Sequence, residues 1–337
     1  MDQLHHRIQA KTDELRMLIP ISGIHHITAI ASDPQRNLDF YTNVLGLRLV
    51  KRTVNFDDPG SYHFYFADEL GSPGTILTFF AWPGAARGRP GAGQVTLTSF
   101  SIPEESVSFW ENRLLQAGLP AEKMGKRFGE EVLTFIDPDG LKLELIAGPT
   151  SRRGRTWTSA PVPSEHAINA LHSVTLCEQG YEHTANVLQT MGFRKVAEEG
   201  NRFRFEVGTG GAGTRADLLC ASEAPFGRVA VGTVHHVAWR VADDDAQRLW
   251  RTHLVKSNLD VTPVMDRCYF HSIYFREPGG VLFELATDPP GFAIDESPET
   301  LGEALKLPPW LERHRSQIED ALPYVELSKP RKEEQDA

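Results

Sequence analysis

The chain repeats one short pattern four times, and this repeat restricts its fold more than any single residue does. Each copy has a short apolar strand, an amphipathic helix that ends near a glycine or asparagine, and two or three further strands. The copies begin at the segments GIHHITAIAS (23–32), QVTLTSFSI (94–102), INALHSVTLC (168–177) and GTVHHVAWRV (232–241). Four such βαβββ modules predict a mixed α+β fold whose curved sheets form half-open barrels.

The first copy shows how each module is specified locally. Leu38, Tyr41 and Leu45 recur at helical spacing, Asp33 can cap the start of this helix, and Gly46 can end it. We expect such helices to cover the convex face of each sheet, which leaves the concave face to hold a ligand.

The repeat also predicts how the chain is divided. We expect an N-terminal extension (1–20), an N-terminal domain of modules 1 and 2 (21–150) and a C-terminal domain of modules 3 and 4 (167–290). A linker rich in proline, serine, arginine and glycine joins the domains at 151–166, and a helical C-terminal tail follows at 291–337.

Composition excludes several classes of partner and predicts a compartment. There are 35 Lys+Arg against 45 Asp+Glu, a formal net charge of −10, so no attraction to nucleic acid or an anionic membrane is expected. Three scattered cysteines without CxxC spacing are typical of a reduced intracellular protein. With neither a signal peptide nor a long apolar run recognisable, the sequence predicts a cytoplasmic protein.

Strand alternation indicates which polar side chains face the concavity. In the fourth copy Val237 and Trp239 form the apolar, helix-facing side, so His236 points to the other face. The same alternation turns His26 and Thr28 inward in the first copy, and Glu284 inward in the strand VLFELA. It places His25 and His235, the first members of the two His-His pairs, on the helix side.

Two imidazoles and one carboxylate that leave open coordination positions are the ligand set of oxygen-activating iron(II) enzymes, and this set also admits manganese or zinc. Pairing of module 1 with module 2 would split the set between two barrels. Pairing of module 1 with module 4 brings His26, His236 and Glu284 into one barrel. The other barrel would then hold Glu144, the repeat equivalent of Glu284, with no inward histidine, and we interpret Glu144 as a relic or a surface-facing carboxylate.

These residues lie in segments that carry a family resemblance. The chain resembles the vicinal-oxygen-chelate superfamily and, within it, the hydroquinone-type ring-cleaving dioxygenases often grouped with glyoxalases. The resemblance covers roughly residues 21–320 and rests on GIHHITAI, DFYTNVLGLRLVKRTVNFDD, YHFYFADELGSPGTILTFF, EEGNRFRF, HHVA (235–238) and the run from Arg267 to DPPGF. It implies that His26, His236 and Glu284 bind iron(II), and that the substrates are a substituted para-hydroquinone and dioxygen.

The resemblance also implies which residues line the site, namely His25, Thr28, His235, Arg267 and Tyr274. We expect Tyr274 to hydrogen-bond the substrate and Arg267 to stabilise developing negative charge. His25 and His235 are candidate acids or bases, although alternation places both on the helix side.

Other interpretations of the sequence remain open. The chain could be a glyoxalase-type metal isomerase acting on a thiol conjugate, or a quinone- or drug-binding protein without catalysis. His63 and His271 lie on predicted strands, where lining a pocket and simple packing are equally good interpretations. A homo-oligomer is expected only because symmetric assembly is common.

Overall fold

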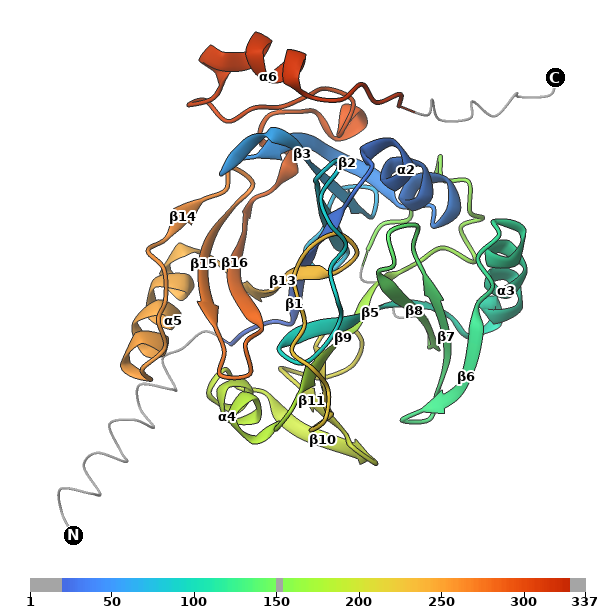
Figure 1. Ribbon diagram of the computed structural model, residues 1–337, viewed down its shortest axis with the longest axis vertical. Helices are drawn as coiled ribbons and strands as arrows, with labels where there is room; N and C mark the ends of the chain where they lie inside the picture. Colours follow the sequence, from blue (N-terminus) through green and yellow to red (C-terminus); the bar gives the residue numbers. More distant parts are fainter. Residues whose placement is uncertain (1–19, 150–153, 328–337) are drawn as a thin grey trace.

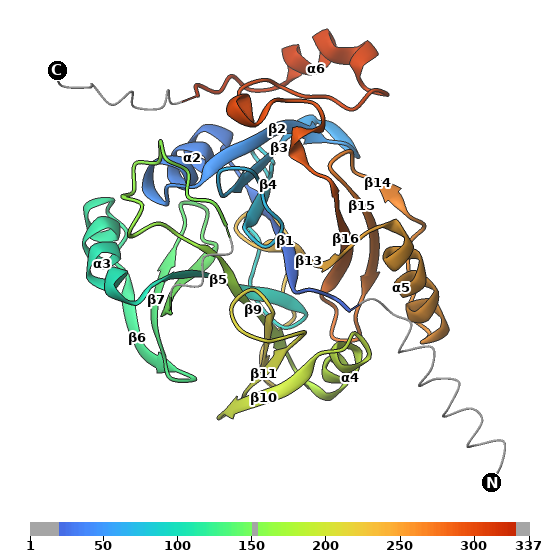
Figure 2. The same cartoon turned by 180° about the vertical axis from the view of Figure 1, so that it is seen from behind.

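The structure is a computed structural model that describes residues 20–149 and 154–327. Almost all of the predicted N-terminal extension, the start of the linker and the charged end of the tail therefore lie outside the described residues. Figures 1 and 2 show two strongly curled sheets, with the main helices on the outside of the molecule.

The first half of the chain contains modules 1 and 2. Module 1 comprises β1 (Ile24–Ala31), α2 (Pro34–Asp39), the π-helical turn η1 (Phe40–Val44), β2 (Arg48–Asn55), β3 (Asp58–Ala67) and β4 (Ile76–Ala81). Module 2 comprises β5 (Gln94–Pro103), the 3₁₀ turn η2 (Glu104–Ser106), α3 (Val107–Gln116), β6 (Glu122–Arg127), β7 (Glu130–Ile136) and β8 (Lys142–Gly148).

The second half contains modules 3 and 4 and the tail. Module 3 comprises β9 (Ala170–Glu178), α4 (Glu182–Thr190), β10 (Arg194–Glu199), β11 (Arg202–Glu206) and β12 (Arg215–Cys220). Module 4 comprises β13 (Val234–Val241), α5 (Asp244–Lys256), β14 (Met265–Asp266), β15 (Phe270–Arg276) and β16 (Leu282–Pro290). The tail contains η3 (Phe292–Ile294), η4 (Pro298–Thr300), η5 (Glu312–His314) and α6 (Arg315–Ala321).

Modules that are distant in the sequence pair in one sheet, and the predicted pairing of modules 1 and 4 is confirmed. One eight-stranded sheet has the order β14-β15-β16-β13-β1-β4-β3-β2, which joins module 4 to module 1. The other has the order β10-β11-β12-β9-β5-β8-β7-β6, which joins module 3 to module 2. The predicted α+β fold with half-open barrels is confirmed. The two sheets each take one module from either predicted domain, and the domain boundaries themselves stay a prediction.

Local sequence accounts for the helix that opens module 1. The Asp33 side chain accepts a hydrogen bond from the backbone N–H of Arg36 at 2.8 Å, and Pro34 occupies the first turn, where no N–H is needed. The chain leaves η1 at Gly46 with φ of +71°, and a Cβ there would collide with Val162. Glycine therefore meets both a conformational and a steric demand.

Two apolar layers hold the first sheet from opposite sides. The larger cluster lies between the strands of both sheets and their helices, and it includes Trp110 of α3 beside the second sheet and Trp250 of α5 beside the first. A smaller cluster fills part of the concave side of the first sheet and includes Tyr65, Phe270 and Phe292. The concavity is thus packed at one end, and its polar side chains are confined to the rest.

The C-terminal tail packs along β2, the edge strand of module 1 (Figure 1). The backbone N–H of Lys306 donates to the Arg52 carbonyl at 2.9 Å. The fully buried Lys51 side chain pairs with Asp295 at 2.5 Å and with Glu296. The helix α6 of the tail covers seven residues. No helix within the described part of the chain is long and apolar enough to cross a membrane.

A buried carboxylate lies where the two sheets meet. Glu178, at the end of β9, is 1% exposed, and its Oε1 has no hydrogen-bond partner. The side chain lies against Gly279 in the turn before β16, where a Cβ would collide with it. Burial, and then the nearby Glu277 carboxylate, raise the pKa of Glu178 to about 8.

This raised pKa makes stability depend on pH. The unfolded carboxyl ionises near 4.5, so the folded state is increasingly penalised as pH rises from there to about 8. We expect Glu178→Gln to have almost the stability of wild type at pH 5 and to be more stable at pH 9. Urea unfolding at both pH values measures the difference. The exposed Glu223→Gln is the control, and a Glu178→Gln protein that is less stable at pH 9 would contradict the assignment.

Candidate metal centre

The site is built on the seam where β1 pairs antiparallel with β13. Thr28 lies opposite His236, and His26 lies opposite Ala238. The register skips one residue in each strand, which is His25 in β1 and His235 in β13. Each His-His pair therefore contains a β-bulge, and a bulge breaks the alternation of side chains between the two faces.

The bulges turn both histidines of each pair to the concave side. Ile24 and Ile27 are three residues apart, yet both belong to the helix-side core, and the same holds for Val234 and Val237. The expectation that His25 and His235 face the helices is therefore wrong. Strict alternation failed because it presumed an unbroken strand.

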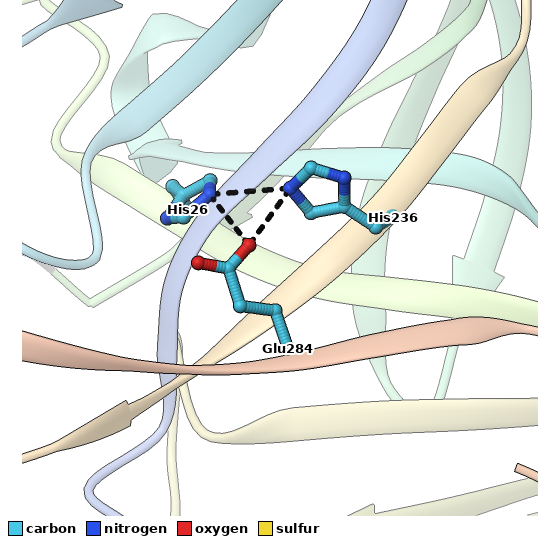
Figure 3. Close-up of side chains that lie close together, drawn as sticks. All are labelled: His26, His236 and Glu284. Carbon is cyan, nitrogen blue, oxygen red and sulfur yellow. Dashed lines mark hydrogen bonds and ion pairs between the residues drawn. The ribbon is translucent and has the colours of Figure 1, made fainter. Parts of the chain in front are cut away.

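Three side chains from three strands converge in the concavity. His26 comes from β1, His236 from β13 and Glu284 from β16 (Figure 3). Glu284 Oε2 lies 2.9 Å from His236 Nε2 and 3.3 Å from His26 Nε2, and the two Nε2 atoms are 3.4 Å apart. All three side chains are buried, and their ligand atoms lie within 4.8 Å of one another. The structure thus brings the three predicted metal ligands together.

The donor atoms fit a divalent cation. Ser272 Oγ donates to Glu284 Oε1 at 2.5 Å, whereas the buried Oε2 has no hydrogen-bond partner and points toward the two imidazoles. Burial alone would raise the pKa of Glu284, but His26 and His236 outweigh it and hold this pKa well below the usual range. An ionised carboxylate with one orphaned oxygen beside two Nε2 atoms is a set of ligands that a cation satisfies.

Each bulge histidine contacts the ring of the candidate ligand that follows it. His25 Nδ1 lies 2.9 Å from His26 Nδ1, and His235 Nδ1 lies 2.8 Å from His236 Nδ1. A ring that offers its Nε2 lone pair to a cation must carry its proton on Nδ1, so with a cation bound His26 and His236 would donate and the bulge histidines would accept. Burial lowers the pKa of His25 well below its usual value and that of His235 to about 3, which keeps both rings neutral acceptors.

Tyr274 and Arg267 lie on the module 4 side of the site. Tyr274 lies opposite Glu284 in the β15–β16 ladder, and its ring centroid is 5.7 Å from that of His236. Arg267 Nε donates to Tyr274 Oη at 3.2 Å, and Arg267 Nη2 donates to Asp57 Oδ2 at 3.1 Å. Burial, and then Glu284, raise the pKa of Tyr274, so its hydroxyl stays a donor. Arg267 thereby links module 4 to the β2–β3 turn of module 1.

Thr28 and His63 lie on the module 1 side. Thr28 is fully buried beside Thr78, with their hydroxyl oxygens 2.9 Å apart. His63 Nε2 lies 2.8 Å from Thr78 Oγ1, so His63 joins the polar groups of the concavity. His271 instead faces α5, where its Nδ1 lies 2.6 Å from Asp244, and both residues line a separate cavity with Cys268 and Trp310. The sequence could not separate the two histidines, because their faces depend on the pairing of β3 and β15.

The second sheet has the same frame without the histidine ligands. Ser99 lies beside both Ser173 and Glu144, as Ala238 lies beside His26 and Glu284. Ser173 therefore stands in place of His26. Arg127 donates two hydrogen bonds to Glu144, at 2.7 and 2.8 Å.

The structure corrects two points about this second concavity. Glu144 is fully buried, so the surface-facing alternative for this residue is wrong. The expectation of no inward histidine is also wrong, because His172 occupies a bulge and points inward, with its Nδ1 3.0 Å from Ser173 Oγ. Within residues 20–149 and 154–327, only His26, His236 and Glu284 form a group of three His, Cys, Asp or Glu side chains close enough to hold a metal.

The fold and the site agree with what the sequence is similar to. The model of the Glyoxalase/Bleomycin resistance protein/Dioxygenase superfamily matches residues 23–145. A Bacillus subtilis protein named "Putative ring-cleaving dioxygenase MhqO" is 48% identical over 303 residues, which cover 89% of this chain and 95% of that protein. The chain belongs to this superfamily.

Its relatives within the superfamily include other proteins named for ring cleavage. The "Chlorohydroquinone/hydroquinone 1,2-dioxygenase" of Sphingobium indicum is 36% identical, over 88% of this chain and 95% of that protein. The crystal structure of a "putative dioxygenase" from Bacillus subtilis matches with a TM-score of 0.88 at 48% identity, covering 92% of this chain and 99% of that one. Glyoxalase I from Zea mays has the same fold, with a TM-score of 0.60 at 13% identity, covering 79% and 92%.

We predict that the equivalent glutamates of the two sheets differ in their effect on metal binding. We expect the wild-type protein to bind one divalent cation per chain. Glu284→Gln removes an anionic ligand and should lose most of the cation on dialysis, whereas the matched Glu144→Gln should keep it. Elemental analysis after dialysis measures the stoichiometry, with circular dichroism to check folding. Equal loss in the two variants would refute the assignment.

The orienting role of His235 predicts a graded effect. Phenylalanine at this position removes the acceptor for His236 Nδ1–H and should weaken cation binding by about 10–100-fold. Glutamine offers an acceptor oxygen and should lose less. Competition titration of the cation against a chelator gives the three affinities, and equal affinity in wild type and His235→Phe would contradict the role.

Proposed function

We propose that this protein is an iron(II)-dependent, extradiol-type ring-cleaving dioxygenase that acts on a substituted para-hydroquinone with dioxygen. The observation that carries the proposal is the buried set of two imidazoles and one carboxylate, since three protein ligands leave coordination positions for substrate and dioxygen. The names of the relatives support the choice of a hydroquinone as substrate.

The bound iron would supply activation of dioxygen and acidify a coordinated hydroxyl. The protein's own residues bind and orient the aromatic ring. Tyr274 can donate a hydrogen bond to a substrate oxygen, because its raised pKa keeps the hydroxyl protonated. Arg267 holds the Tyr274 hydroxyl in place and offers positive charge near oxygens that become anionic.

His25 and His235 have a positioning role in this proposal. Their Nδ1 atoms face the ligand rings, so each holds an imidazole in the tautomer that presents Nε2. We therefore assign both histidines to orienting the ligands rather than to proton transfer.

Oxygen uptake tests the proposed function directly. Protein loaded anaerobically with iron(II) should consume one dioxygen per hydroquinone. The rate of oxygen uptake should be higher with substituted hydroquinones than with catechol or gentisate. Glu284→Gln should be inactive and Glu144→Gln active. An oxygen electrode and mass spectrometry of the ring-opened acid provide the measurement.

The outcomes separate the alternative functions. Isomerisation of a thiol conjugate without oxygen uptake would favour a glyoxalase-type enzyme. Tight hydroquinone binding without turnover in fully loaded protein would favour a binding protein.

A further inference from the structure

A row of polar side chains crosses the concave face next to the metal ligands. The ladders place His236 opposite Thr28, Thr28 beside Thr78, and Thr78 opposite Tyr65. Paired residues share a face of the sheet, so the row points into the concavity with His236. His63 is two residues from Tyr65 in β3 and shares its face.

These side chains form one continuous hydrogen-bonded chain. Thr28 Oγ1 lies 2.9 Å from Thr78 Oγ1, Thr78 Oγ1 lies 2.8 Å from His63 Nε2, and Tyr65 Oη lies 3.0 Å from His63 Nδ1. Thr28, Thr78 and Tyr65 are buried. One end of the chain therefore adjoins a metal ligand, and the other lies two strands away.

A count of the polar hydrogens shows that all three hydrogen bonds of this row can reverse their direction. Burial, and then the rings of His26 and His236, lower the pKa of His63 well below its usual value, so His63 rests as a neutral ring. Four groups then carry four polar hydrogens and share three hydrogen bonds. The spare hydrogen lies either on Tyr65, which leaves Thr28 an acceptor toward the site, or on Thr28, which makes it a donor.

The second sheet has no such reversible row of hydrogen bonds at the equivalent positions. By register, Thr175 stands for Thr28, Asp217 for Thr78, Arg202 for His63 and Arg204 for Tyr65. Arg202 donates to Thr175 at 2.8 Å, and Arg204 is held by Asp217 at 2.8 and 3.0 Å. Arginines cannot give up their protons, so these contacts are fixed. The reversible chain is confined to the sheet that carries the metal ligands.

We propose that Thr28, Thr78, His63 and Tyr65 form a proton relay that serves the substrate oxygen bound beside His236, an inference that rests on the proposed function. The substrate hydroxyl passes its proton to Thr28 Oγ1, the Thr28 proton moves to Thr78 Oγ1, and the Thr78 proton moves to His63 Nε2. Only O–H and N–H bonds are exchanged and no electron moves. His63 carries the positive charge only transiently, because its lowered pKa favours return of the proton to a product oxygen along the same path.

The relay predicts that its middle member affects turnover more than binding. Thr78→Val removes the hydroxyl with little change in volume and should slow single turnover by about 10²-fold, the usual contribution of a positioned proton-transfer group. Anaerobic hydroquinone binding should stay within twofold of wild type, and the solvent deuterium isotope effect should change. Thr78→Ser should restore the wild-type rate and isotope effect. The control is Thr98→Val, which deletes a buried hydroxyl in the second sheet.

Nitrogen-15 NMR of the histidine rings tests the relay independently of catalysis. In metal-free protein His63 should be neutral with its proton on Nδ1, and Thr78→Val should move the Nε2 resonance because that atom loses its donor. Identical His63 resonances in the two proteins would overturn the relay even if hydroquinone is not the substrate. Thr78→Val protein with wild-type turnover and isotope effect, or with the same loss as Thr98→Val, would overturn it as well.

Discussion

The antiparallel seam between β1 and β13 is the constraint on which the rest of the molecule depends. It joins the first module to the last, and it carries a bulge at each His-His pair. Without the bulges, His25 and His235 would pack against the helices and the ligand imidazoles would lose their acceptors. One bulge in each strand therefore supplies two concave histidines per strand, one a candidate metal ligand and one in contact with the Nδ1 of that ligand.

The two sheets show how one frame supports different chemistry. In the first sheet Glu284 faces two imidazoles and keeps an unpartnered oxygen, whereas in the second Glu144 is fully occupied by Arg127. A guanidinium neutralises a buried carboxylate permanently. Neutral imidazoles do not, so the negative charge of the carboxylate remains available to an exchangeable cation. The same strand pairing thus yields a candidate metal centre in one concavity and a structural ion-pair network in the other.

The two walls of the first concavity differ in the chemistry they can offer. The module 4 wall presents Tyr274 and Arg267, whose raised pKa values keep their hydrogens in place. The module 1 wall presents hydroxyls and the neutral ring of His63, whose hydrogens can be exchanged along the chain. The walls meet where Arg267 contacts Asp57, so substrate would lie between fixed positive charge and a reversible hydrogen-bond chain.

Sequence alone determined the repeat, the α+β class and the inward direction of His26, Thr28, His236 and Glu284, because alternation holds wherever a strand is regular. It also determined the pairing of modules 1 and 4, since only that arrangement completes the ligand set. The tertiary structure alone decided the direction of His25 and His235, the burial of Glu144 and the contact between His63 and Thr78. Bulges, ion pairs and contacts between distant strands depend on the register between segments far apart in the chain, which no local pattern encodes.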